Sequence, residues 1–142
     1  MEHPVEIITV AQVIQQAVAP VFLLTGVGAI LGVLSTRLAR VIDRFRVLDN
    51  IAEEDGAVHA AEMQTLIRRS RWIHWAISLC TLCALLICVV IAALFIGSES
   101  GKDPSRTISV FFIAAMLALI AGLLCFLREI ALATGIINIP NR

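Results

Sequence analysis

Three long stretches without a charged residue dominate the sequence and limit what it can fold into. They cover residues 7–36, 72–98 and 107–127. Each reaches the roughly 20 residues that an α-helix needs to cross about 30 Å of hydrocarbon. They explain why 59% of the residues are hydrophobic and only 15% are charged, against about 25% charged in a soluble domain. The pattern predicts an all-α integral membrane protein with three transmembrane helices, and it excludes a soluble enzyme, a disordered chain and a secreted disulfide scaffold.

The basic side chains predict how the chain is oriented in the membrane. The connection between the first two stretches carries seven arginines, whereas the second connection carries only Lys102 and Arg106. Because loops rich in Lys and Arg stay in the cytoplasm, we expect the N-terminus outside and residues 37–71 and the C-terminus inside. The segment before the first stretch has no basic residue, so we expect no cleaved signal peptide. Trp72 and Trp75 are typical of an anchor at the inner interface.

The spans are expected at about residues 18–36, 72–97 and 107–127, within a single membrane domain covering residues 1–142. The region before the first span leaves two alternatives. Residues 5–16, where apolar groups alternate with glutamines, lie at the outer interface, or one long helix continues through Pro20 and is kinked there. After the third span, residues 128–142 are expected to form a tail that follows the inner interface or covers the base of the hairpin described next.

Helical periodicity continues beyond the first two spans. One apolar stripe comprises Leu34, Leu38, Val41, Ile42, Phe45 and Leu48, and a matching one comprises Met63, Leu66, Ile67 and Ile73. Glu53-Glu54-Asp55-Gly56 predicts a polar turn between the stripes. The first two spans are therefore expected to extend into the cytoplasm as an antiparallel helical hairpin, residues 37–71.

Two runs carry a resemblance to a known family. They are Pro20-Val21-Phe22-Leu23-Leu24-Thr25-Gly26-Val27-Gly28 and Val33-Leu34-Ser35-Thr36-Arg37-Leu38-Ala39-Arg40-Val41-Ile42-Asp43-Arg44-Phe45-Arg46. With Arg68-Arg69 and Phe126-Leu127-Arg128-Glu129-Ile130, they make nearly the whole chain resemble the domain of unknown function 2721 family, small bacterial membrane proteins with three helices. The resemblance implies a bacterial inner-membrane location and supplies no activity, so no functional residue is carried over from it.

No pattern in the chain indicates catalysis or a cofactor. The spacing of Cys80 and Cys83 suits zinc or redox chemistry, but no second ligand pair accompanies them, and together with Cys88 and Cys125 they favour apolar packing inside the spans. His74 has no His or carboxylate at ligand spacing. Lys and Arg balance Asp and Glu at 11 each, so we expect no nucleic-acid partner. We therefore expect no enzyme, no metal and no cofactor.

Gly28, Gly32 and Thr36 place three small residues at four-residue spacing. Small residues let helix backbones approach closely in lipid. This face is expected either to pack against another helix of the same chain or to hold copies together in a homo-oligomer.

Charged residues gather where the hairpin and the third span reach the inner interface. This candidate charge cluster comprises Arg37, Arg40, Asp43, Arg44, Arg46, Arg128 and Glu129. Three interpretations remain, in decreasing order of preference: positive-inside anchoring with ion pairs inside the hairpin, contact with anionic lipid headgroups, and the charged mouth of a pore. Glu129 needs a partner, and the arginines of the first loop are the nearest supply.

A last stripe along the first helix bears on function. Its candidate pore-facing members run from amides through apolar groups to arginines, namely Gln12, Gln16, Leu23, Ile30, Arg37 and Arg44. A helix facing the axis of a homo-oligomeric channel would show this order, and so would any helix that runs from interface to cytoplasm. The sequence thus leaves two hypotheses, a homo-oligomeric channel or a non-conducting scaffold whose hairpin binds anionic lipid or a protein partner of unknown identity.

Overall fold

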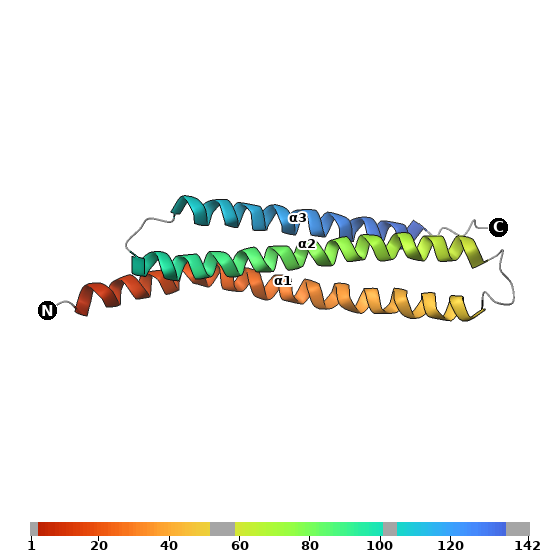
Figure 1. Ribbon diagram of the computed structural model, residues 1–142, viewed down its shortest axis with the longest axis horizontal. Coiled ribbons are helices and arrows are strands. Elements are labelled where there is room, and N and C mark those ends of the chain that lie inside the picture. Colours follow the sequence, from red (N-terminus) through yellow and green to blue (C-terminus); the bar gives the residue numbers. More distant parts are fainter. Residues whose placement is uncertain (1–2, 52–58, 101–104, 136–142) are drawn as a thin grey trace. The chain divides into compact units, whose positions relative to one another are not determined.

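The helices of this protein are longer than a membrane crossing requires. The computed structural model describes residues 3–51, 59–100 and 105–135, which form three α-helices and no strand: α1 (His3–Ile51), α2 (His59–Ser100) and α3 (Ser105–Gly135) (Figure 1). Each helix is apolar enough to span a membrane, and only 22% of its most apolar window is buried. Apolar surface exposed to that extent is typical of contact with lipid. The predicted all-α membrane fold is confirmed.

α1 is a single continuous helix that contains Pro20. Residues 5–16 therefore belong to the same helix as the first span. This is the second of the two alternatives, the long helix that continues through Pro20. Pro20 is buried and has no N–H to donate to the carbonyl of Gln16. Membrane helices tolerate such a gap because neighbouring groups and small backbone adjustments compensate for it.

All the helices continue past the ends of the predicted spans. α1 runs to Ile51 and α2 starts at His59, as a helical hairpin requires, while the turn predicted at residues 53–56 lies outside the described residues. α3 continues from the expected end of its span, Leu127, to Gly135, about two turns further. The first part of the expected interfacial tail is thus helical, and its remainder, residues 136–142, also lies outside the described residues.

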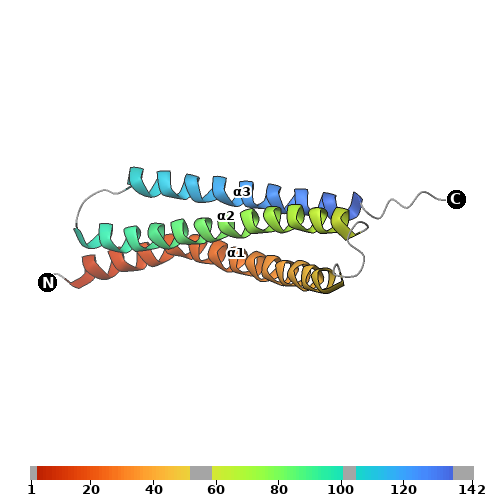
Figure 2. The ribbon, with the colours of Figure 1, turned by 45° about the vertical axis from the view of Figure 1, so that its right-hand side comes forward.

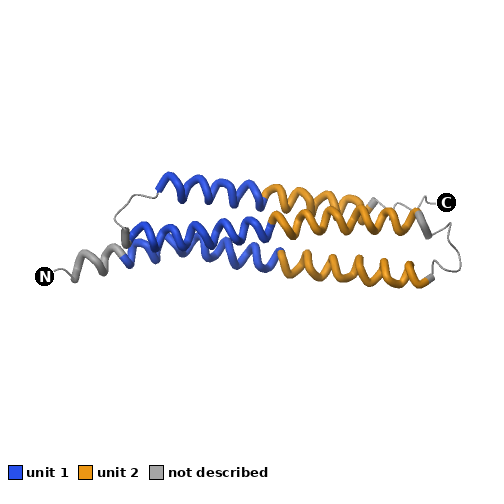
Figure 3. Tube along the Cα trace, viewed as in Figure 1, with its two compact units in different colours: residues 1–30, 80–119 blue, residues 31–79, 120–142 orange. Residues whose placement is uncertain are grey.

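Contacts divide the chain into two units, and each unit takes a segment from every helix (Figure 3). Unit 1 contains residues 1–30 and 80–119, and unit 2 contains residues 31–79 and 120–142. Within each unit the helical segments lie side by side in both views (Figures 1 and 2). The units are therefore not successive domains along the sequence.

Buried residues recur at intervals of seven in both units. In unit 2 they include Leu34, Val41 and Leu48 on α1 and Leu66 and Ile73 on α2. In unit 1 the same spacing relates Cys80 to Ile87 and Cys83 to Val90 on α2. A seven-residue period keeps one face of a long helix against its neighbours, with each side chain fitting between side chains of the next helix.

The hairpin part of unit 2 has its own apolar core. Val41, Leu48, Leu66 and Ile73 form a buried cluster, and Leu38, Met63 and Ile77 pack against it. Ile42 and Ile67 belong to the predicted stripes but are 40% and 47% exposed. Each of them follows a core residue directly, so a rotation of about 100° per residue turns it away from the core.

Candidate functional site

Glu129 of α3 is a carboxylate buried in the core of unit 2. Its relative exposure is 0%. It lies seven residues after Gly122, which is also buried, so the period of α3 directs its side chain inward. An ionised carboxylate is costly to bury unless it is paired and hydrogen-bonded.

Arginines from the two other helices of unit 2 pair with Glu129. Arg37 of α1 donates from Nη1 to Oε2 at 3.3 Å, and Arg69 of α2 donates from Nη2 to Oε1 at 2.9 Å. The side chain of Arg69 is 23% exposed and that of Arg37 is 41% exposed. One carboxylate therefore joins α1, α2 and α3, and the cluster of Arg37, Arg69 and Glu129, called here the ion triad, carries one net positive charge.

The ion triad lies beside two contacts between arginine and an aromatic ring. The guanidinium carbon of Arg37 lies 5.2 Å from the centre of the Phe126 ring. That of Arg128 lies 5.9 Å from the centre of the Trp72 ring. Each such contact contributes about 0.5–1 kcal/mol at a partly exposed site. The aromatic rings therefore hold two arginines where the apolar stretches end.

The chemistry available to the ion triad is electrostatic. Both carboxylate oxygens of Glu129 accept hydrogen bonds from guanidinium groups, which suits a fixed ion pair better than proton transfer. Among the described residues, no group of three or more His, Cys, Asp or Glu side chains is placed to hold a metal ion. Cys80 and Cys83 are fully buried in the core of unit 1 and form no disulfide with each other.

The structure brings only part of the candidate charge cluster together. Arg37 meets Glu129, and Arg44 pairs with Glu62 at 3.0 Å, with both of the latter side chains about half exposed. Arg40, Asp43 and Arg46 are exposed and form no ion pair with another described residue. Arg128 contacts Trp72 rather than a carboxylate in the described part of the chain.

The candidate pore-facing stripe has no single environment. Gln12 and Gln16 are exposed, Leu23 and Ile30 are half-buried, and the two arginines, Arg37 and Arg44, are paired within the chain. The stripe therefore ends in charges that the same chain already partly neutralises.

The face made by Gly28, Gly32 and Thr36 is uncovered within the described chain. A Cβ atom added to either glycine would meet nothing within 4 Å. The hydroxyl of Thr36 donates to the carbonyl of Gly32 at 3.0 Å, so this polar group is satisfied inside its own helix. In the described part of the chain, no side chain or neighbouring helix therefore lies against the two glycines.

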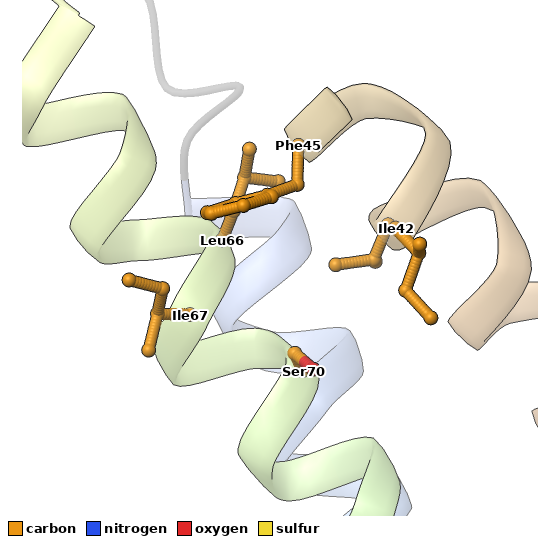
Figure 4. Close-up of a pocket in the computed structure, with 6 residues that line it drawn as sticks. Ile42, Phe45, Leu66, Ile67 and Ser70 are labelled. Atoms are coloured by element: carbon orange, nitrogen blue, oxygen red, sulfur yellow. The ribbon is translucent and has the colours of Figure 1, made fainter. Parts of the chain in front are cut away.

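Two of the hollows on the surface of unit 2 are lined entirely by described residues. The arginine pocket has a volume of about 510 Å³ and is lined by Ala61, Gln64, Thr65, Arg68, Arg69, Ala131 and Leu132. The apolar groove has a volume of about 230 Å³ and is lined by Val41, Ile42, Phe45, Leu66, Ile67 and Ser70. In the groove, the Phe45 ring extends from α1 toward Leu66 on α2 (Figure 4). The two hollows differ in character, because one contains guanidinium groups and the other is almost entirely hydrocarbon.

Arg69 is the functional candidate that the sequence did not single out. It is one of three arginines that precede the second span, and positive-inside anchoring explains all three equally well. The seven-residue period was the available signal. Arg69 follows the core residue Leu66 by three positions and precedes the core residue Ile73 by four, which places it on the buried face of α2.

Comparison with known proteins adds a family and no activity. The family described as "Protein of unknown function (DUF2721)" matches residues 17–139. No curated protein and no solved structure matches the chain.

Proposed function

Because the chain belongs to the DUF2721 family, whose function is unknown, its role has to be inferred from its own residues. We propose that it is a non-conducting membrane protein that gathers anionic phospholipid around the arginine-rich end of unit 2. It is assigned to the inner membrane of a bacterium, with the N-terminus outside and the hairpin and C-terminus in the cytoplasm. No enzymatic activity is assigned, because the buried carboxylate of Glu129 is already held by two guanidinium groups.

The observation that supports this function most strongly is the distribution of charge along the hairpin. At the ends of the charge-free stretches marked by residues 36, 72 and 127, six arginines lie within four residues, at Arg37, Arg40, Arg68, Arg69, Arg71 and Arg128, with Glu129 as the one carboxylate among them. Residues 43–62 have the opposite balance, six carboxylates against two arginines. Cations are thus concentrated at the depth of the lipid headgroups and not over the hairpin as a whole.

Four of these six arginines are available to a ligand. Arg40, Arg68, Arg71 and Arg128 are exposed, whereas Arg37 and Arg69 hold Glu129. A basic residue close to an anionic leaflet contributes about 1 kcal/mol, so the four together contribute roughly 4 kcal/mol at low salt. That attraction is enough to enrich anionic lipid around the protein.

Lipid analysis of the purified protein tests this function. Lipids that remain bound after mild detergent extraction are identified by mass spectrometry for the wild type, for Arg40→Gln/Arg71→Gln and for Arg44→Gln/Arg46→Gln. We expect anionic lipid to be enriched over the bulk membrane in the wild type and in the second variant, whose arginines lie further along the hairpin, and to fall in the first. Bound lipid with the bulk composition in all three proteins contradicts the proposal.

The assumed orientation has its own test. In a background without the four native cysteines, new cysteines replace Asp55 and Ser100 one at a time. An impermeant thiol reagent applied to intact cells should label position 100 and leave position 55 unlabelled. The reverse result would place the hairpin on the outer side.

Conduction by a homo-oligomer is the second candidate function, and the uncovered glycine face favours it. Gly28 and Gly32 have open space around them, as contact between copies requires. If this function holds, Gly28→Leu lowers the oligomer size in nanodiscs, and Leu23→Ser or Ile30→Ser wets the constriction and raises ion flux in proteoliposomes. An intact oligomer without flux in the wild type and both serine variants leaves the non-conducting function as the better account.

A further inference from the structure

We propose that the arginine pocket is a specific site for the phosphate group of an anionic phospholipid. The inference deepens the proposed function, on which it rests, by assigning one pocket and one chemical group to the lipid contact. The same chemistry would also admit a free phosphate ion, and the experiment below separates the two sources.

The walls of the pocket come from two helices. On α2 the lining residues lie at helical spacing on one face, Ala61, Gln64, Thr65, Arg68 and Arg69, and α3 contributes Ala131 and Leu132. At about 510 Å³, the volume is within the usual range of small-molecule sites. The pocket is therefore large enough for a headgroup and not only for a single ion.

Donors to an oxyanion come from Arg68 and Gln64. Both side chains are exposed, and an arginine presents a planar fork that fits two phosphate oxygens. Thr65 is not counted as a donor, because its hydroxyl already donates to the carbonyl of Ala61 at 3.0 Å. The donor set thus combines one strong cation with one neutral amide.

Arg69 makes the floor of the pocket positive. Its Nη2 donates to Glu129, but its Nε is buried and has no hydrogen-bond partner. A buried donor without an acceptor costs about 1–3 kcal/mol. Since the ion triad as a whole keeps one net positive charge, it attracts a phosphate group that enters the pocket.

No carboxylate lines the pocket in the described part of the chain. Glu62 is next to Ala61 in sequence, but its carboxylate is held by Arg44 on α1. The charge of Arg68 is therefore not neutralised within the lining and is available to an anion that enters the pocket.

An exposed apolar track leads along α3 toward the pocket. Ile120, Leu124 and Leu127 are 51%, 57% and 61% exposed, and their spacing of four and three residues continues to Ala131 in the pocket wall. Such a track fits an acyl chain lying against the helix while the phosphate occupies the pocket. This favours a lipid over a free phosphate ion.

The test uses the full chain, delipidated in detergent, with bound ligand counted by native mass spectrometry. Phosphatidylglycerol, phosphatidylcholine and inorganic phosphate are titrated separately. The pocket variant is Arg68→Gln, because Arg69 also holds Glu129 and its loss would disturb the fold. The matched control is Arg46→Gln, an exposed arginine on α1 that does not line the pocket and lies further along the hairpin.

We expect saturable binding of phosphatidylglycerol, weakened about tenfold or more by Arg68→Gln and by less than about twofold by Arg46→Gln, because the loss of a charge-assisted hydrogen bond to phosphate corresponds to roughly a tenfold change or more. Inorganic phosphate that binds as tightly as the lipid and is lost in Arg68→Gln keeps the pocket and assigns it to free phosphate. An equal effect of both variants, with phosphatidylglycerol still preferred over phosphatidylcholine, overturns the pocket and leaves the lipid-gathering function in place. Equal binding of phosphatidylglycerol and phosphatidylcholine to the wild type overturns both.

Discussion

Units 1 and 2 use the same spacing of core positions and fill them differently. The core of unit 1 is entirely apolar over the described residues, with small side chains such as Ala17, Cys80 and Ala115 among its members. The core of unit 2 has larger aliphatic groups, including Leu48 and Ile73, and it also contains Glu129. The difference concerns the chemistry of the side chains and not the periodicity of the helices.

The comparison shows what each environment can contribute to stability. Lipid chains are as apolar as a core of Val and Ile, so packing in unit 1 gains contacts and gains little from the hydrophobic effect. Unit 2 contains the hairpin, where exclusion of water stabilises the cluster of Val41, Leu48, Leu66 and Ile73. Its ion triad in addition joins the three helices of the unit through a single carboxylate.

The largest effect is expected for Glu129→Ala, which leaves two arginines facing each other. We expect the free energy of unfolding of unit 2 to fall by about 4 kcal/mol, because removing one partner of a buried ion pair isolates the remaining charge. Titration with SDS in mixed micelles, followed by the fluorescence of Trp72 and Trp75, measures the change. Protection of Cys83 from a thiol reagent reports on unit 1 in the same titration. Simultaneous loss of both signals would show that the units unfold as one.

The second prediction compares matched truncations. Leu48→Ala in unit 2 should cost about 3 kcal/mol, since it combines lost burial from water with a cavity. Ile87→Ala in unit 1 should cost about 1–2 kcal/mol. Lipid chains are as apolar as the core of unit 1, so the variant loses packing contacts and little hydrophobic free energy. Both residues are almost completely buried, which makes the pair a fair comparison. Equal costs, measured in the same SDS titration, would contradict the assigned difference between the units.

The two arginines of the ion triad should not be equivalent. Arg69→Met is expected to cost about 2 kcal/mol and Arg37→Met about 1 kcal/mol, because the bond from Arg69 is shorter and its side chain is less exposed. In the double variant Arg69→Met/Glu129→Leu the loss should be partly restored, since no buried charge then lacks a partner. A larger loss from Arg37→Met than from Arg69→Met would reverse the assigned roles.

The smallest effect is expected at the exposed pair of Arg44 and Glu62. Glu62→Ala should change the free energy of unfolding by less than about 1 kcal/mol, and the difference should disappear in about 1 M salt, where screening acts over some 3 Å. These side chains are 55% and 45% exposed, against 1% for Glu129. A cost that persists at high salt would show that exposure is not what separates this pair from the ion triad.

Much of the fold could be predicted from the sequence because it depends on local signals. Charge-free stretches locate the spans, and periodicity located the hairpin core at Val41, Leu48 and Leu66, which are buried as expected. The need of Glu129 for an arginine from the first loop was also predicted, and Arg37 meets it. The sequence could not decide whether residues 5–16 form a separate interfacial segment or the start of one long helix. In both cases Pro20 removes one backbone hydrogen bond at the same place.

The rest depended on packing between helices. The sequence around Arg68, Arg69 and Arg71 does not distinguish Arg69 from the other two arginines. Only the burial of Leu66 and Ile73 shows that the Arg69 side chain lies on the buried face of α2. The sequence likewise did not predict that α3 continues past Arg128 and Glu129, because a charged pair after an apolar stretch is typical of the end of a membrane span. Neutralisation of Glu129 by two arginines is what lets the helix continue with that residue inside.

The placement of Glu129 on the last of the described helices also has a consequence for biosynthesis. Arg69 precedes its carboxylate by 60 residues and Arg37 precedes it by 92. At about 5–20 residues per second, a ribosome needs several seconds to synthesise the shorter of these intervals. During that time both arginines have been synthesised but their shared counter-ion has not, and a chain that stops early never acquires it. Synthesis of the third helix is thus the event that supplies Arg37 and Arg69 with the carboxylate that joins them.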